Sequence, residues 1–96
     1  MYQVIYAKYV EKDLKHVDKA VVQEFKAKHL RSIQKDPYSG AKRLQGILRI
    51  FLVYRFQVKG VSYRVAYQIF EQKLLVVLVS FGARENFYKE LKRRTR

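Results

Sequence analysis

Two arginines in the second half of the chain are spaced so that a β-hairpin would bring them together. The segments 50–58 and 61–70 are rich in aliphatic and aromatic residues, and Lys59-Gly60 between them is a plausible tight turn. Antiparallel register about that turn places Arg55 opposite Arg64. Directly opposed residues point to the same face of a sheet, so we expect the two guanidinium groups side by side.

Two neighbouring positive charges repel, and two explanations remain open for this pair. A phosphate held between Arg55 and Arg64 would explain it, because guanidinium groups stay charged and bind phosphate oxygens bidentately. A solvated face with acidic neighbours is the alternative explanation. A register slip of one residue would send one of the arginines to the other face.

Arg84 and Tyr88 form a second candidate pair near the C-terminus. The segment 74–81 is apolar on both faces of a predicted strand, which indicates a central strand of the sheet. Gly82 is expected to end it. If the segment 83–96 is helical, Tyr88 lies one turn after Arg84 on the same face. An arginine and a tyrosine there can hold a phosphate and stack on a base. Alternatively, Phe87 and Tyr88 pack the helix onto the sheet.

The histidines and the missing motifs exclude several kinds of chemistry. His29 lies on an apolar helix face and is expected to pack or hydrogen-bond there, and His16 is expected to end its helix. No further ligands are spaced to join them, so we expect no metal site. The chain has no cysteine, which excludes disulfides and thiolate chemistry, and it has no Ser-His-Asp arrangement or glycine-rich phosphate loop.

The first half of the chain is predicted to be mostly helical. A short β-prone segment, 2–6, is followed by a helical stripe formed by Val10, Leu14 and Val17. Asp18 is a candidate N-cap for a second helix. The predicted core face of that helix carries Val22, Phe25, His29 and Ile33, flanked by Val21 and Leu30. The loop 35–40 contains the single proline and ends the helical half.

The expected fold class is therefore α+β, with the order β-α-α-β-β-β-α. Hairpins join the last three strands, which makes the sheet mainly antiparallel. The edge at which the N-terminal strand joins stays open. We expect the N-terminal helical hairpin to pack on one face of the sheet and the other face to remain free for binding.

Size and charge limit the class of protein. The chain has 96 residues, enough for one domain spanning residues 1–96. Its net charge of +13 at pH 7 favours a nucleic-acid partner. An acidic protein, an anionic membrane surface or a merely basic protein are the alternatives. No apolar stretch is long enough to span a membrane, and no signal peptide is recognised, so a cytoplasmic location is expected.

The order and spacing of these motifs resemble the RelE/ParE toxin superfamily of type II toxin–antitoxin systems. The pattern is Leu-x-Gly, Tyr-Arg-x-x-Tyr-x-Ile, Gly-x-Arg-Glu and Tyr. The residues that carry the pattern are Leu44-Gln45-Gly46, Tyr54-Arg55, Gly60, 63–69, 76–79 and 82–88. The resemblance covers the whole chain, and the family's element order agrees with the order predicted here.

The resemblance to RelE-like members implies a ribosome-dependent mRNA endoribonuclease that needs neither metal nor cofactor. The ribose 2′-OH attacks the adjacent phosphate in the ribosomal A site, leaving a 2′,3′-cyclic phosphate and a 5′-OH. By resemblance, Arg64 would stabilise the pentavalent phosphate and Arg84 would act at the leaving oxygen. Tyr88 would stack on the RNA, and Arg55 would take the place of one of the family's paired strand lysines.

The family's other strand lysine corresponds to Val53, so the usual candidate for the general base is absent. Lys42, Lys59 and Lys89 are the lysines that could replace it, and the sequence does not choose among them. The spacing from Arg84 to Tyr88 is also shorter than in the best-known RelE. Four basic residues are predicted to bind RNA: Lys42, Lys59, Lys89 and Arg93.

Two alternatives to the nuclease share most of these features. A ParE-like toxin would inhibit DNA gyrase by protein contact and cut no RNA. A non-enzymatic RNA-binding module is the other alternative. Either toxin implies a cognate antitoxin, expected to be an acidic, partly disordered segment that folds over the basic surface. DNA would be contacted only through the antitoxin complex, and no membrane partner is expected.

Overall fold

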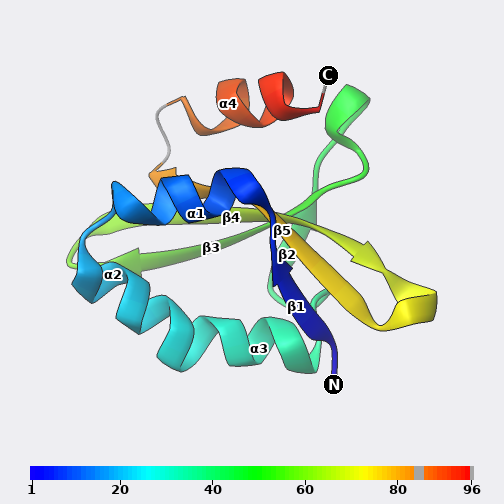
Figure 1. The fold of residues 1–96 in the computed structure, drawn as a ribbon, viewed down its shortest axis with the longest axis horizontal. Coiled ribbons are helices and arrows are strands. Elements are labelled where there is room, and N and C mark those ends of the chain that lie inside the picture. The colour runs from blue at the N-terminus through cyan, green and yellow to red at the C-terminus, as the bar shows by residue number, and fades with distance from the viewer. Residues whose placement is uncertain (84–85, 96) are drawn as a thin grey trace.

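A computed structural model describes residues 1–83 and 86–95, which form a five-stranded sheet between helices (Figure 1). The strands are β1 (Gln3–Tyr6), β2 (Ala41–Arg43), β3 (Leu52–Val58), β4 (Val61–Phe70) and β5 (Leu75–Ala83). The helices are α1 (Lys8–Lys15), α2 (Lys19–Glu24), α3 (Leu30–Lys35) and α4 (Phe87–Arg94). The strand order is β1-β5-β4-β3-β2. None of the helices described is long and apolar enough to cross a membrane.

The antiparallel strands β3, β4 and β5 form the centre of the sheet, as predicted. The β3–β4 register pairs Val58 with Val61 and Arg55 with Arg64. Lys59 and Gly60 both have positive φ angles, 51° and 81°. A two-residue turn with both angles positive matches the twist of the flanking strands, and it fixes the register. The hairpin prediction is confirmed.

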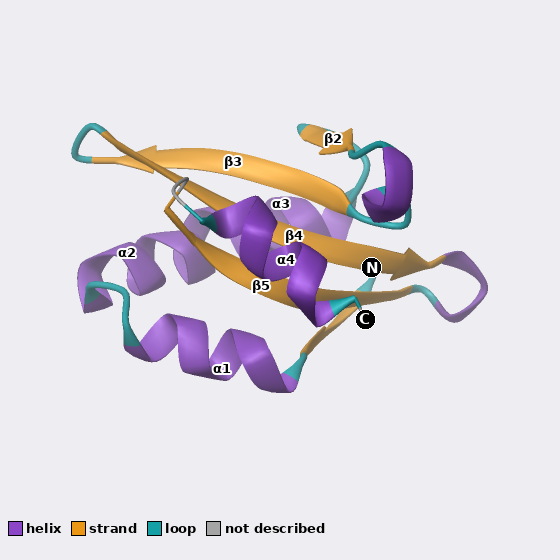
Figure 2. Ribbon diagram, turned by 90° about the horizontal axis from the view of Figure 1, so that it is seen from above, coloured by secondary structure: helices purple, strands orange, loops and turns teal. Residues whose placement is uncertain are grey.

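The two edges of the sheet contain features that the pattern did not predict. β1 joins parallel to β5, with Gln3 opposite Leu75 and Tyr6 opposite Leu78. It leaves the second half of β5 uncovered, and α1 lies along that stretch (Figure 2). β2 is a three-residue strand that pairs with β3, too short for a recognisable alternation. β5 also continues through Gly82 to Ala83, one residue past Gly82, the predicted end.

The N-terminal helices cover one face of the sheet and enclose the main core. Asp18 caps α2 by accepting a hydrogen bond from the Ala20 N–H at 2.9 Å, as predicted. A π-helical segment, Phe25–His29, joins α2 to α3. This wider turn changes the phase of the helix, so Val21 is buried at the start while Val22 is only half-buried. Phe25 and Ile33 are buried as predicted, and Val21, predicted as a flanking residue, is buried in place of Val22.

α4 packs against the opposite face, so the prediction that helices cover one face only was wrong. Phe87 and Leu91 of α4 form a second small core with Phe51, Val53 and Ala66. Apolar residues at two adjacent strand positions on that face attract an amphipathic helix. The helix is also shorter than predicted and begins at Phe87.

Candidate functional site

Arg55 and Arg64 lie on the α4 face of the sheet, on neighbouring strands. Their Cα positions are directly paired, and Arg64 is paired on its other side with Gly82 of β5. Open space lies above Gly82, because a Cβ built there would meet nothing within 4 Å. Arg55 is exposed and Arg64 is half-buried. The two guanidinium groups therefore share one face, next to a position where the sheet carries no side chain.

Tyr88, in the first turn of α4, lies above Arg64. The Cζ of Arg64 is 5.8 Å from the centroid of the Tyr88 ring, within the range of a cation–π contact. The Tyr88 ring also packs edge-on against Phe87, at 5.1 Å between centroids. Phe87 is buried and fixes α4 to the sheet, as the packing alternative predicted, whereas Tyr88 is half-buried. The two adjacent aromatic residues thus have different roles.

The guanidinium group of Arg64 has two nitrogen atoms that are buried without an acceptor. Neither Nε nor Nη1 has a hydrogen-bond partner among the described residues. A buried donor left unsatisfied costs about 1–3 kcal/mol, and more when it is charged. Charged donors in this state favour an incoming anion with several oxygen atoms. A guanidinium in this state has donors available for an oxyanion.

Lys42 adds a further cation to the same cavity as Arg55. It lies on β2 opposite Val53 and so points to the α4 face. A cavity of about 290 Å³ is lined by Lys42, Val53, Arg55 and Tyr88, together with residues of the 40–44 segment. A lysine of β2 thus lies directly opposite Val53 of β3, on the same face of the sheet.

The other predicted residues are not all brought to this cavity. Lys89 borders a neighbouring hollow of about 580 Å³ on the far side of Tyr88, together with Ile47 and Leu48. Lys59 is exposed at the hairpin turn. Arg93 is exposed and pairs with Glu90 within α4 at 2.7 Å. Arg84 lies outside the described residues.

His29 has a packing role rather than a place in the site. Its Nδ1 lies 2.8 Å from the Tyr54 hydroxyl, and its ring stacks on Phe56 at 4.5 Å between centroids. Burial lowers the pKa of His29 below its ordinary value. The prediction of a hydrogen-bonded core histidine is confirmed. Among residues 1–83 and 86–95, no three His, Asp or Glu side chains gather as metal ligands.

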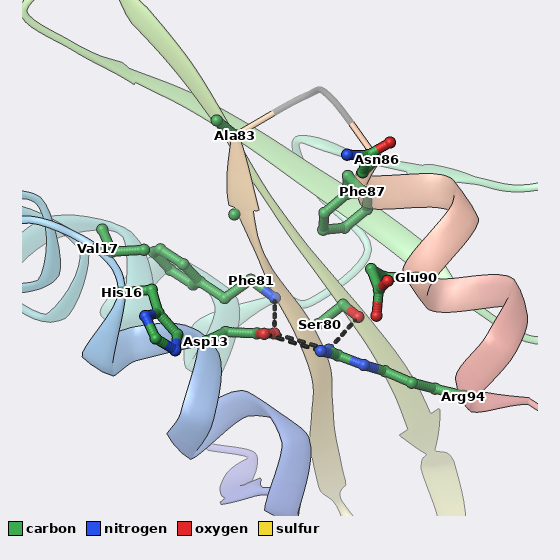
Figure 3. Close-up of a pocket in the computed structure, with 11 residues that line it drawn as sticks. Asp13, His16, Val17, Ser80, Phe81, Ala83, Asn86, Phe87, Glu90 and Arg94 are labelled. Atoms are coloured by element: carbon green, nitrogen blue, oxygen red, sulfur yellow. Dashed lines mark hydrogen bonds and ion pairs between the residues drawn. The ribbon is translucent and has the colours of Figure 1, made fainter.

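An ion pair joins α1 to α4 (Figure 3). The sequence alone did not predict it. Arg94 donates two hydrogen bonds to the Asp13 carboxylate, at 2.7 and 2.8 Å, and a third to Ser80 at 2.7 Å. These residues border a cavity of about 260 Å³ between α1, β5 and α4. Asp13 and Arg94 are 81 positions apart, and neither belongs to a local motif. Asp13 was visible only as an acidic residue in a basic chain.

Comparison with known proteins identifies the family. Residues 4–92 match the family described as "ParE-like toxin of type II bacterial toxin-antitoxin system". The chain belongs to this family of toxins. A putative RelE-like toxin protein of Escherichia coli is 30% identical over 84 residues, which cover 88% of this chain and 84% of that protein.

Solved structures of RelE toxins share the fold. A mutant of E. coli toxin RelE in the free state superposes with a TM-score of 0.71 at 25% identity, covering 96% of both chains. The toxin–antitoxin complex RelBE2 from Mycobacterium tuberculosis matches with a TM-score of 0.71 at 23% identity, covering 86% of this chain and 98% of that one. The intact E. coli RelBE complex matches with a TM-score of 0.70 at 24% identity, covering 88% of this chain and 99% of that one. The α+β, RelE-like fold class is confirmed.

Proposed function

We propose that this toxin is an endoribonuclease that cleaves messenger RNA in the ribosomal A site. The observation that supports this most is the Arg64 guanidinium. It has two buried nitrogens with no acceptor in the part of the chain that the structure describes, and it lies beside Arg55 and beneath Tyr88. That arrangement suits a phosphodiester flanked by a base. It also resembles the site that the superfamily's RNA-cleaving members would require.

The cleavage step needs stabilisation of charge on the phosphate. The ribose 2′-oxygen forms a bond to phosphorus and gives up its proton. The bond from phosphorus to the 5′-oxygen breaks, and that oxygen takes up a proton. Arg64 and Arg55 would bind the phosphate oxygens as negative charge grows on them. Tyr88 would stack on the neighbouring base, and Arg84 is proposed to act at the leaving oxygen.

Lys42 is the lysine that we assign to the role of the absent strand lysine. Arginine keeps its proton in proteins, so Arg55 and Arg64 are poor acceptors for the 2′-hydroxyl proton. Of the three candidate lysines, Lys42 lies in the cavity with Arg55 and Tyr88. It is therefore our candidate for the acceptor of that proton, a role that it would perform as the neutral amine, because the ammonium form has no acceptor.

The proposed partners follow from charge and from the relatives. With a net charge of +13, the chain would attract RNA and the ribosome electrostatically. Related toxins were solved in complex with their antitoxins. We expect an acidic antitoxin segment to cover the same basic surface and DNA to be contacted only through that complex.

The proposal can be tested in a reconstituted translation reaction. The purified toxin should cut a translated mRNA and leave 2′,3′-cyclic phosphate and 5′-OH ends. The same mRNA should be cut much more slowly when ribosomes are omitted. Arg64→Ala should abolish cutting while the far-UV circular dichroism stays unchanged. Intact mRNA after prolonged incubation with the folded wild-type toxin would refute the nuclease.

Inhibition of DNA gyrase is the second candidate function. One observation favours it: the matching family is described as ParE-like. The resemblance adds that Val53 stands where RNA-cleaving members would carry a strand lysine. A gyrase inhibitor would arrest growth without cutting mRNA and would reduce supercoiling by purified gyrase. Binding of RNA without either effect would indicate the third alternative, a non-enzymatic RNA-binding module.

A further inference from the structure

α4 carries Tyr88 to the site, but its own sequence does little to hold it in place. The helix has eight residues, and helices of that length are marginal in isolation. Its N-cap residue, Asn86, has a positive φ of 64° and makes no side-chain capping bond. Two of its residues, Phe87 and Leu91, are buried in the small second core. The position of α4 therefore depends on tertiary contacts.

The last residue of α4 makes the strongest polar contact between this helix and the rest of the molecule. Arg94 binds both oxygens of Asp13 in a bidentate pair, and it also donates to Ser80 Oγ (Figure 3). A further hydrogen bond goes from Arg94 to the Val79 carbonyl. The guanidinium carbon lies 5.0 Å from the centroid of the Tyr9 ring. Arg94 thus joins α4 to α1 and β5 together.

Asp13 is itself fixed independently of α4. Its Oδ2 accepts a hydrogen bond from the Phe81 N–H at 3.0 Å, on the half of β5 that β1 does not cover. One carboxylate therefore accepts a hydrogen bond from a β5 amide that β1 does not reach, and it also binds the guanidinium of Arg94. The side chains of Arg94 and Asp13 are 12% and 17% exposed. Water screens such a pair poorly, and the hydrogen bonds from Arg94 to Asp13 raise the pKa of the guanidinium.

The other ion pairs in residues 1–83 and 86–95 do not join separate helices. Lys28 pairs with Glu24 four residues away, and Arg93 pairs with Glu90 three residues away. Both pairs are exposed, where an ion pair contributes little. Among the ion pairs of these residues, Asp13–Arg94 is thus the one that connects two different helices.

We infer that Asp13 and Arg94 are positioning residues that hold α4 against the sheet and so keep Tyr88 over Arg64. Phe87 and Leu91 hold the start and middle of the helix by apolar packing, and Arg94 holds its end. With both ends of α4 fixed, the Tyr88 ring is held above the guanidinium of Arg64, at the observed 5.8 Å. The consequence for cleavage rests on the proposed function, whereas the effect on α4 does not.

Arg94→Gln and Asp13→Asn test the inference, because each removes one charge and keeps a polar side chain. Arg31→Gln is the matched control, since Arg31 is an exposed arginine on α3 away from the site. In hydrogen exchange, amides of Glu90 to Arg94 should exchange at least tenfold faster in both variants. Amides of β3 and β4 should exchange as in the wild type, which shows that the sheet remains folded. Unchanged α4 exchange in both variants would overturn the inference.

A double-mutant cycle with Tyr88 separates positioning from general destabilisation. Arg94→Gln should lower kcat for mRNA cleavage about tenfold, with a smaller change in KM, at a temperature where the protein is fully folded. Tyr88→Ala should lower kcat as well. If Arg94 acts through Tyr88, the double variant should be no slower than Tyr88→Ala alone. If the decrease in kcat of the double variant equals the product of the two single decreases, the inference is contradicted.

Failure of the proposed function would be recognised separately. If the folded wild type cleaves no mRNA, the proposed nuclease activity is refuted. The positioning role is then tested by NMR of the Arg64 and Tyr88 side chains. The NMR signals of Arg64 Nε–H and of the Tyr88 ring should then shift together in Arg94→Gln and stay in place in Arg31→Gln. Signals unchanged in both variants would refute the positioning role.

Discussion

At the scale of single residues, Arg64 differs from its neighbour Arg55 in its access to water. Arg55 is exposed, whereas two nitrogens of Arg64 are buried without an acceptor among the described residues. Charged donors held out of water interact more strongly with an anion than donors in water do. Arg64 should therefore contribute more to a charged transition state than Arg55.

Arg64→Ala should lower the rate of mRNA cleavage by about 100-fold or more, the size of effect seen when a donor to a developing oxyanion is removed. Arg64→Lys should recover little, because an ammonium group lacks the planar fork of donors. Single-turnover cleavage rates of both variants and of Arg55→Ala would measure this. A larger decrease in Arg55→Ala than in Arg64→Ala would contradict the assignment.

Lys42 and Lys59 should differ in importance, although sequence alone ranked them equally. Lys42 lines the cavity with Arg55 and Tyr88, while Lys59 lies at the hairpin turn. Lys42→Ala should therefore slow cleavage several-fold more than Lys59→Ala, and it should change the pH–rate profile. The rates of the two variants, compared across pH, check this. Equal rates would show that Lys42 is one surface charge among many.

Residue-level prediction worked where the residues are close in sequence or joined by a tight turn. The Arg55–Arg64 pair follows from a two-residue turn that fixes the register. The Asp13–Arg94 pair depends on where α4 packs, and the placement of Lys42 opposite Val53 depends on how β2 pairs with β3. Neither can be predicted from a local sequence pattern. Only tertiary packing brings such residues together.

At the scale of elements, strong periodicity predicted the hairpins and the N-terminal helices. It missed β2 because a strand of three residues has too few positions to show alternation. The face covered by α4 was wrong, because Phe87 and Leu91 show that the helix is amphipathic but not which side of the sheet it meets. The partner of β1 was left open, since a parallel pairing with β5 depends on the intervening chain.

The packing of His29 against β3 should make stability depend on pH. Burial lowers the pKa of His29, so protonation favours the unfolded chain. The free energy of unfolding should be fully maintained above pH 6.5 and should fall as the pH drops below that value. In His29→Gln this decrease should be smaller between about pH 7 and 5, whereas His16→Gln, at an exposed position, should retain it. Urea titrations at several pH values measure the slopes, and equal slopes in His29→Gln and wild type would contradict this role.

At the scale of the whole molecule, the net charge of +13 sets how the protein meets its partners. Binding to RNA or ribosomes should weaken steeply with salt, because lysine and arginine replace condensed counterions. Removing one lysine that binds a phosphate should reduce the slope of log K against log salt by about 0.7 for single-stranded RNA. Titrations of wild type and Lys42→Ala at several salt concentrations would show this. Affinity that is independent of salt would indicate an apolar protein target instead.

The most direct test of the nuclease is a map of 5′ ends on cellular mRNA after inducible expression, with Arg64→Ala as the control. The proposed function predicts cuts inside translated regions, in frame with the codons, that are absent from the Arg64→Ala strain at equal protein levels. Growth arrest by the wild type without any new 5′ ends would contradict it. In that case the supercoiling activity of DNA gyrase would be measured next.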